Sequence, residues 1–340
     1  MEKIEKLRKD IDDYDAKILE FLEKRKNIAR DIGKLKRIEN IEIIDPEREK
    51  KILSNKGEFK YIFKEIIGLC RKIENDLDVV YLGPEGTFTE EAALSFFSSY
   101  TKIIPMDSIE EVFNNVEKGK YGIVPVENST HGSVPETVDL LIERSVYIAG
   151  EVIKKISHNL ISNKPMNEIK KIYSHPQSFA QCKNFIAKHV PNAELIPVDS
   201  TAKGVIIAKE NNEAAIGTIL AAQKYKMKIM RKYIEDNPNN YTRFLVLFKN
   251  QGEGDKTSVL FSIKNDPGSL YNVLKAFSDE KINLTKIESR PSKRNPWEYI
   301  FYVDFEGDLK EKRVNKSLQK LQSSTMFFKT LGSYPSWEED

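Results

Sequence analysis

The feature that most constrains this chain is a heptad pattern at its beginning. Apolar residues recur in alternating steps of three and four, and one member of the series is an arginine. The series is Ile4, Leu7, Ile11, Tyr14, Ile18, Phe21, Arg25, Ile28, Ile32 and Leu35. Such a pattern predicts one long helix over residues 2–37 whose apolar stripe faces other helices.

Arg25 occupies a position at which an aliphatic side chain would normally be buried. A buried guanidinium is costly unless an anion pairs with it. Because the stripe contains no acidic residue, that anion would come from elsewhere in a helical bundle or from a ligand. Alternatively, Arg25 sets the register of a coiled coil or extends its charged end to solvent.

Two further cations bear on this choice. Lys36 lies on nearly the same helix face, roughly 16 Å further along the axis, whereas Arg8 lies roughly 25 Å before Arg25. A small ligand could contact Arg25 and Lys36 but hardly the Arg8 of the same chain. If all three serve one kind of site, Arg8 serves a partner's copy. Two shorter helices, predicted at 46–54 and 58–76, cannot cover the stripe in a monomer, which also favours a dimer.

Composition excludes several classes of protein. The 340 residues can form two or three domains with real cores. A net charge of +2, without a basic stripe of interleaved aromatics, argues against nucleic acid as a partner. The two cysteines, Cys70 and Cys182, have no metal-ligand spacing, and there is no glycine-rich nucleotide loop. No signal segment and no long apolar run are present. We therefore expect a cytoplasmic protein without metal, cofactor or membrane segment.

The pattern changes to alternating strands and helices at Val79, and this predicts an α/β region of two lobes with a cleft. The expected strands are 79–82, 121–126, 146–153, 171–173 and 214–217. The expected helices are 108–118, 135–142, 176–188 and 201–210, preceded by a helix that Thr89 caps. After a flexible link at 251–255, six segments follow the ferredoxin-like order strand–helix–strand–strand–helix–strand. They are 257–264, 268–279, 283–290, 298–305, 309–322 and 327–332.

Several motifs resemble one known family. Arg8, Arg25, Lys36, Asp45, Arg48 and Glu49 have the spacing of the helical type of chorismate mutase, as fused to prephenate dehydratase. The segments 83–90, 124–132, 174–177 and 240–244 are similar to the prephenate dehydratase motifs. Gly268-Ser-Leu and Glu288-Ser-Arg-Pro291 are similar to the phenylalanine-sensing ACT domain of that family. The resemblance implies an all-α mutase bundle at 1–77, a two-lobed, periplasmic-binding-protein-like dehydratase at 78–250 and a ferredoxin-like ACT domain at 256–337.

The resemblance also implies a chorismate site on the helices. Chorismate rearranges to prephenate by a pericyclic shift, so the site must hold a reactive conformer and stabilise negative charge on the ether oxygen. Arg25 and a partner's Arg8 would hold the carboxylates, and Lys36 would face the ether oxygen. Asp45 and Glu49 would hold the hydroxyl, with Arg48 supporting the same turn.

Two positions depart from the family pattern, which usually has serine and glutamine where this chain has Cys70 and Glu74. Glutamine donates to the ether oxygen, whereas an ionised glutamate would repel it. Glu74 could replace it only in the protonated form, which predicts mutase activity that falls as the pH rises. In the alternative, Glu74 pairs with Lys36 and the mutase is weak or lost. Cys70 would then be a small packing residue beside the site.

For the dehydratase, the resemblance implies that Thr242 supplies the essential hydroxyl, because prephenate must lose carbon dioxide and its ring hydroxyl. The expected prephenate-binding residues are Thr87, Glu127, Asn128, Ser129, Ser174, His175, Gln177 and Arg243. For Thr242 and Arg243 to face the substrate together, the chain would have to turn there. Thr87 could instead be a plain helix cap, and His175 a structural hydrogen-bonding residue. His131, His158 and His189 are expected to be structural or exposed.

The tail would bind phenylalanine through Gly268, Ser269, Leu270, Glu288, Ser289 and Arg290. The leading hypothesis is a bifunctional enzyme, a homodimer or higher homo-oligomer, that converts chorismate to prephenate and prephenate to phenylpyruvate under feedback inhibition by phenylalanine. One alternative is a dehydratase whose helices serve only dimerisation. The other is an amino-acid sensor without catalysis.

Overall fold

The computed structural model describes residues 1–39, 41–75, 77–291 and 299–336, and the side chains of 46 and 47 are also excluded from description. The chain divides into two compact units. One comprises Met1–Asp78 with Phe97–Lys102, and the other comprises Val79–Phe96 with Ile103–Asp340. In the described part of the chain, no helix is long and apolar enough to cross a membrane.

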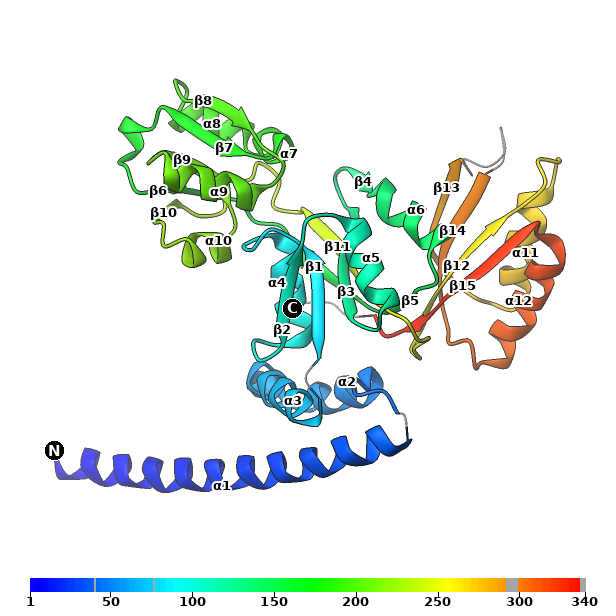
Figure 1. The fold of residues 1–340 in the computed structure, drawn as a ribbon, viewed down its shortest axis with the longest axis horizontal. Coiled ribbons are helices and arrows are strands. Elements are labelled where there is room, and N and C mark those ends of the chain that lie inside the picture. The colour runs from blue at the N-terminus through cyan, green and yellow to red at the C-terminus, as the bar shows by residue number, and fades with distance from the viewer. Residues whose placement is uncertain (40, 76, 292–298, 337–340) are drawn as a thin grey trace. The chain divides into compact units, whose positions relative to one another are not determined.

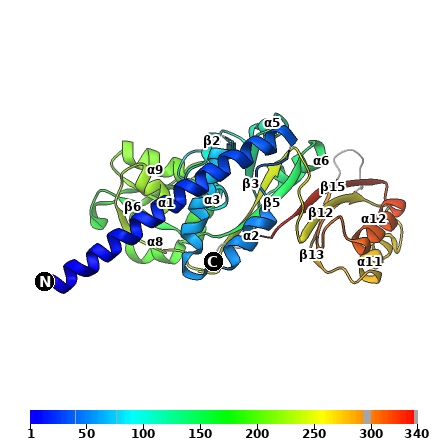
Figure 2. The ribbon, with the colours of Figure 1, turned by 90° about the horizontal axis from the view of Figure 1, so that it is seen from below.

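The first unit consists of the three predicted helices. They are α1 (Glu2–Glu39), α2 (Pro46–Ser54) and α3 (Lys60–Glu74), the last preceded by the short 3-10 helix η1 (Gly57–Phe59). Figure 2 shows the whole length of α1. The Asp45 side chain caps α2 by accepting from the backbone N–H of Arg48. The sequence prediction for these helices is confirmed to within two residues, except that residue 76 lies outside the described residues.

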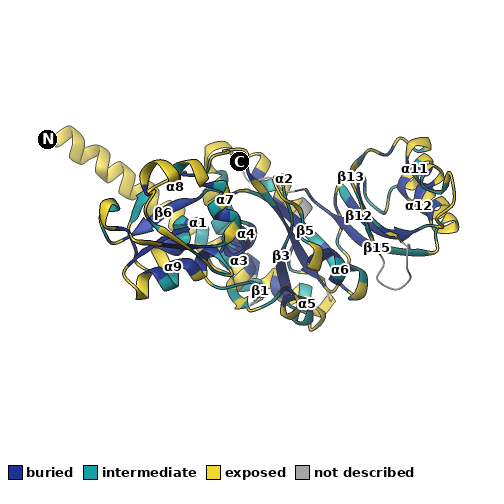
Figure 3. Cartoon of the chain, turned by 90° about the horizontal axis from the view of Figure 1, so that it is seen from above, coloured by how far each residue is buried: buried dark blue, intermediate teal, exposed yellow. Residues whose placement is uncertain are grey.

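The face of α1 that packs on α3 is not the heptad stripe. Ala29 and Gly33 are the buried residues of α1. A Cβ at Gly33 would lie 2.5 Å from the carbonyl oxygen of Glu74, so only glycine allows the two backbones this close approach. The nine apolar residues of the stripe are all exposed, and Figure 3 shows the first part of α1 in the exposed colour. The helices of the same chain thus leave the stripe uncovered, as the sequence predicted for a single chain.

The second unit begins with a mixed sheet, which we call the first lobe (Figure 1). Its strand order is β2-β1-β3-β11-β5, and β4 pairs with β3. The strands are β1 (Asp78–Leu82), β2 (Lys102–Met106), β3 (Tyr121–Asn128), β4 (Gly132–Ser133), β5 (Tyr147–Lys155) and β11 (Tyr241–Phe248). The helices are α4 (Phe88–Phe97), α5 (Ile109–Glu117) and α6 (Pro135–Glu143). The sequence missed β2, β4 and β11.

The chain segment between β5 and β11 forms the other lobe. Its sheet has the strand order β10-β6-β9-β7-β8. Its strands are β6 (Asn159–Ser162), β7 (Lys171–Ser174), β8 (Glu194–Pro197), β9 (Ala214–Gly217) and β10 (Ile229–Arg231). Its helices are η2 (Met166–Glu168), α7 (Pro176–Gln181), α8 (Lys183–His189), α9 (Thr201–Glu210) and α10 (Ile219–Lys224). The helix predicted at 176–188 is thus two short helices. The prediction of an α/β region with two lobes is confirmed.

The C-terminal domain has the predicted order of elements. They are β12 (Lys256–Ser262), α11 (Ser269–Asp279), β13 (Leu284–Pro291), β14 (Tyr299–Glu306), α12 (Lys312–Ser324) and β15 (Phe327–Tyr334). The antiparallel sheet has the order β13-β14-β12-β15. Its two helices share a core with Val259, Phe261 and Phe305 of the sheet. The predicted ends at 298 and 337 lie outside the described residues.

The opposite face of this C-terminal sheet packs against the first lobe. Leu260, Tyr302 and Leu331 belong to one buried cluster with Leu141 and Ile148 of the first lobe. Because side chains alternate along a strand, Val259 and Phe261 face the helices while Leu260 faces the lobe. The central strands β12 and β14 are therefore covered on both sides, whereas one face of the edge strand β13 is exposed.

Candidate functional site

A cavity of about 570 Å³ lies between the two lobes of the second unit. The first lobe contributes Thr87, Asn128, Thr242 and Phe244, and the other lobe contributes His158, His175, Gln177 and Lys203. The volume suits a small molecule. The structure thus brings together five residues that the sequence predicted for prephenate: Thr87, Asn128, His175, Gln177 and Thr242.

Thr242 and Asn128 face each other across neighbouring strands. They are register partners on β11 and β3, and Asn128 Nδ2 donates to Thr242 Oγ1 over 2.9 Å. The side-chain oxygen of Asn128 accepts from the backbone N–H groups of Thr130 and His131, at 3.0 and 3.2 Å. Since those groups can only donate, the amide nitrogen must be the atom that faces Thr242. Thr242 therefore receives a hydrogen bond and keeps its own proton for a ligand.

Arg243 lies on the other side of β11. Residues 241–248 form one strand, whose register against β3 shifts after Arg243. Thr242 and Phe244 line the cavity, whereas Arg243 points away from it. Its guanidinium donates to Glu151 and Asp304, at 2.6 and 2.5 Å. The expected turn at Thr242–Arg243 is absent, and the placement of Arg243 in the prephenate site is corrected.

Three other predicted residues also lie outside the cavity lining. Glu127 faces away from the cavity and pairs with Lys286 of the C-terminal domain at 2.8 Å. The Ser129 hydroxyl accepts from the backbone N–H of Tyr241, and the buried Ser174 hydroxyl donates to a backbone carbonyl of β9. The polar groups of these three residues are engaged in these contacts, and none of the three lines the cavity.

His175 stands at the start of α7 and caps it. Its Nδ1 accepts from the backbone N–H of Gln177 over 3.2 Å, so a neutral ring carries its proton on Nε2. Burial lowers the pKa of His175 below its ordinary value, and the charge of Asp199 only partly offsets this effect. Neutral His175 can therefore both cap the helix and donate a hydrogen bond.

Helices α4 and α9 also begin at the cavity. Thr87, not Thr89 as expected, caps α4 by accepting from the backbone N–H of Glu90, and Ser200 caps α9 in the same way. Thr87, Ser200 and Thr201 all line the cavity. The starts of helices carry partial positive charge and free N–H groups, which favour anions. The cavity is thus suited to a carboxylate ligand.

Sequence reasoning gave no role in the cavity to Lys203, or to His158, which it expected to be structural or exposed. Lys203 lies in the first turn of α9 and adds a positive charge to the lining. The His158 ring donates from Nε2 to Gln181, while its buried Nδ1 has no hydrogen-bond partner. Burial also lowers the pKa of His158. For Lys203, the capping residue Ser200 at the start of the same helix was a signal that the sequence offered. For His158, the sequence offers no comparable signal.

In the helical unit, the Arg25 guanidinium is half-buried against α3. It donates to Cys70 Sγ at 2.5 Å and to the carbonyl of Ile66 at 3.3 Å. Burial raises the pKa of the Cys70 thiol, although the charge of Arg25 opposes the shift. Arg25 therefore lies against its own bundle rather than in bulk solvent.

The other predicted mutase residues separate into two groups. Lys36 pairs with Glu74 at 3.0 Å and also donates to the carbonyl of Ile43. Glu49 is buried and pairs with Arg71, a residue that sequence reasoning missed. Arg8 and Arg48 are exposed, and Arg8 pairs only locally with Glu5. Arg71 follows Ile67 by one helical turn on the buried face, which is the kind of signal that singled out Arg25.

Comparison with known proteins identifies the family. Three family models match in succession: chorismate mutase type II over residues 7–75, prephenate dehydratase over 79–252 and the ACT domain over 257–322. A bifunctional chorismate mutase/prephenate dehydratase of Aquifex aeolicus is 42% identical, covering 98% of each chain. One of Pseudomonas aeruginosa is 39% identical with the same coverage. The chain belongs to the bifunctional chorismate mutase/prephenate dehydratase family.

A solved structure supports the same assignment for the larger part of the chain. It is a prephenate dehydratase from Arthrobacter aurescens in complex with L-Phe, 30% identical, with a TM-score of 0.71. The match covers 76% of this chain and 90% of that one.

The candidate phenylalanine residues do not all lie together in the ACT domain. Gly268, with a left-handed φ of 86°, precedes α11, and Ser269 and Leu270 form its first turn. Glu288 and Arg290 face the first lobe instead: Glu288 contacts Ser133 and Lys286, and Arg290 lies 3.3 Å from Asp139. Ser289 is on the exposed face of β13. Glu288 and Arg290 are therefore engaged with residues of the first lobe.

Proposed function

We propose that this member of the family converts chorismate to prephenate in its helical unit and prephenate to phenylpyruvate in the cavity between the lobes. The observation that carries the proposal is the Asn128–Thr242 hydrogen bond inside a cavity at which helices begin. A hydroxyl that accepts one hydrogen bond and keeps its own proton, in a cavity with anion-binding helix starts, suits the loss of a ring hydroxyl from a dicarboxylate.

In the dehydratase step, Thr242 donates its hydrogen bond to the departing ring hydroxyl of prephenate. The bond between the ring and its carboxylate breaks, and its electron pair enters the ring as carbon dioxide leaves. The hydroxyl departs with a proton as water, and the ring becomes aromatic. Asn128 favours this transfer because its amide N–H stabilises the negative charge that develops on Thr242 Oγ1.

The two carboxylates of prephenate would be held by the opposite walls of the cavity. Thr87 at the start of α4 serves one side, and Ser200 with Lys203 at the start of α9 serves the other. His175, neutral at pH 7, would donate from Nε2 and orient the substrate without adding a charge. Binding at several points holds the carboxylate that is lost in line with the ring orbitals.

In the mutase step, Arg25 and Lys36 would bind chorismate from one chain, and the partner subunit's Arg8 would complete the site. The exposed apolar stripe supports this arrangement, because a second copy of α1 would bury it. We therefore propose a dimer through α1. Chorismate binding would require Lys36 to leave Glu74 or Glu74 to be protonated.

Phenylalanine would bind at Gly268–Leu270, with Ser289 as the part of the second motif that remains accessible. The strand order of the ACT sheet supports the ferredoxin-like arrangement. The chain passes from the sheet of the first lobe to that of the other lobe after β5 and returns at β11, which supports the periplasmic-binding-protein-like arrangement. The boundaries 1–77, 78–250 and 256–337 and a cytoplasmic location stay predictions from the sequence.

The test is to assay the two reactions separately in the intact chain. Thr242→Val should abolish phenylpyruvate formation and leave chorismate consumption unchanged, whereas Thr242→Ser should retain part of the dehydratase activity. Arg25→Met should do the reverse. A dehydratase whose helices serve only dimerisation is the second candidate, favoured by the Lys36–Glu74 ion pair. It would be supported if the native chain fails to consume chorismate.

A further inference from the structure

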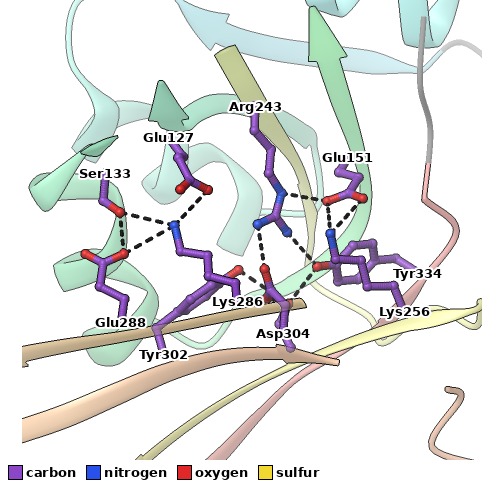
Figure 4. Close-up of polar contacts among 11 residues, drawn as sticks. Glu127, Ser133, Glu151, Arg243, Lys256, Lys286, Glu288, Tyr302, Asp304 and Tyr334 are labelled. Atoms are coloured by element: carbon purple, nitrogen blue, oxygen red, sulfur yellow. Dashed lines mark hydrogen bonds and ion pairs between the residues drawn. The ribbon is translucent and has the colours of Figure 1, made fainter. Parts of the chain in front are cut away.

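Two pairs of residues on β3 and β11 face in opposite directions. Asn128 and Thr242 are register partners that line the cavity, and the next pair, Glu127 and Arg243, points to the opposite side of the sheet. On that side both residues meet charged side chains of the ACT domain (Figure 4). Thr242 and its hydrogen-bond partner Asn128 are therefore each adjacent in sequence to a residue that forms an ion pair with the ACT domain.

The contact at Arg243 is a buried cluster of four charges. The first lobe supplies Arg243 and Glu151, and the ACT domain supplies Asp304 and Lys256. The guanidinium joins both carboxylates, and Lys256 lies 2.9 Å from Glu151. Each domain thus contributes one cation and one anion, so neither domain alone provides the complete set of partners.

Hydroxyl groups complete this cluster. Arg243 also donates to the Tyr334 hydroxyl at 2.9 Å, and the Ser258 hydroxyl contacts Asp304 and Tyr334. Burial opposes ionisation of Asp304, but the charges of Arg243 and Lys256 keep its pKa below the ordinary value. A buried charge pair that is fully hydrogen-bonded fixes geometry, and removing one partner leaves the other uncompensated.

The contact at Glu127 is a second, smaller cluster. Lys286 on β13 lies 2.8 Å from Glu127 and 3.3 Å from Glu288, and it donates to the Ser133 hydroxyl at 3.1 Å. Ser133 belongs to β4, which pairs with the end of β3. Lys286 therefore holds both strands of that short hairpin from the side opposite the cavity.

We propose that Asp304 and Lys286 of the ACT domain are positioning residues for the dehydratase reaction, because they hold the strands that carry Thr242 and Asn128. They touch no substrate. A rotation of β11 about its own axis would move Arg243 and Thr242 together, since both are fixed to one strand. Any change in how the ACT sheet lies against the first lobe would thus alter the Asn128–Thr242 geometry.

This inference rests on the proposed dehydratase function and predicts a specific kinetic signature. Asp304→Asn removes the charge while keeping the shape, and Lys286→Met removes the ammonium while keeping most of the stem. We expect kcat for prephenate to fall roughly 10- to 100-fold in Asp304→Asn, with KM changed less than about threefold, as for a misplaced reacting group. The matched control is Asp279→Asn, an exposed ACT carboxylate that pairs with Lys275 on the surface.

Tyr334→Phe provides a milder probe should Asp304→Asn fail to fold. It removes one hydroxyl from the Arg243 cluster and should lower kcat by about two- to fivefold with thermal unfolding close to that of the native chain. A double-mutant cycle of Lys286→Met with Glu127→Gln should give effects on kcat that do not add, because both substitutions break one contact.

The proposal is overturned if folded Tyr334→Phe and Lys286→Met chains retain native kcat, or if Asp279→Asn loses as much kcat as Asp304→Asn. It is equally overturned if the losses appear in KM alone. A native chain that does not turn over prephenate at all would instead contradict the proposed function, so the two failures are distinct.

Discussion

The ammonium of Lys36 lies 3.0 Å from the carboxylate of Glu74, and both side chains are largely buried between α1 and α3. The cation expected to face the ether oxygen of chorismate is thus paired with a carboxylate of its own chain. The close approach of the α1 backbone at Gly33 to the backbone of Glu74 accompanies this contact. The Glu74 carboxylate therefore neutralises the charge of Lys36, and it would repel the negative charge that develops on the ether oxygen of chorismate.

Replacing Glu74 by glutamine should therefore improve the mutase. Glu74→Gln frees the charge of Lys36 and adds an amide donor, and we expect kcat/KM for chorismate to rise about tenfold. The rate of chorismate consumption checks this point, with Glu20→Gln on the exposed face of α1 as the control. Lower activity in Glu74→Gln would contradict this account of the site.

The exposed stripe of α1 leads to a test of the shared mutase site. Arg8→Ala and Arg25→Ala chains should each lack mutase activity as homodimers. In a purified heterodimer of the two, one site would contain both native arginines and the other would contain neither. We expect this heterodimer to recover about half of the native activity. Phe21→Glu, which places a charge in the stripe, should yield monomers and abolish the recovery. No recovery in a stable heterodimer would show that Arg8 does not serve the partner.

The helical unit was predictable because its signals are local. A heptad pattern and an Asp-Pro helix start determine α1 and α2, so their ends agree with the structure to within two residues. Arg25 was noticed because a charge interrupted the pattern. Arg71 obeys the same logic on α3 but was overlooked, and its pairing with Glu49 depends on how α2 folds back.

The dehydratase site was predictable only in part, because a motif gives neighbours in sequence and not the face of a strand. Thr242 and Arg243 are adjacent, yet β11 sends them to opposite sides of the sheet. No local pattern in the sequence indicates that the ACT domain covers the second side of this sheet. For the same reason Glu127 was assigned to the substrate, although it pairs with Lys286.

The pH dependence of the dehydratase should reflect His175. Burial lowers its pKa below the ordinary 6.5, so the ring is neutral at pH 7 and becomes charged as the pH falls. Protonation removes the Nδ1 acceptor that caps α7, and we expect kcat/KM for prephenate to decline on the acid side, below pH 6.5. His175→Asn keeps a capping oxygen but has no group that titrates there. Its residual activity should therefore lack this acid limb, whereas an unchanged limb would assign it to another group.

The direction of the Asn128–Thr242 hydrogen bond gives the sharpest test of the chemistry. In Asn128→Asp, one carboxylate oxygen can still accept from the N–H groups of Thr130 and His131, so the loop after β3 keeps its support. The other carboxylate oxygen stands in place of the amide N–H donor and can only accept. The Thr242 hydroxyl would then donate its hydrogen bond to this oxygen and not to the substrate. We expect kcat for prephenate to fall about 100-fold, with a smaller change in KM, because a transition-state donor has been lost. Mutase activity of the same preparation controls for the amount of intact chain. If Asn128→Asp instead retained native kcat, Thr242 could not depend on Asn128 as its donor. Another group lining the cavity would then have to activate the Thr242 proton. The first group to test is His158, whose buried Nδ1 has no hydrogen-bond partner.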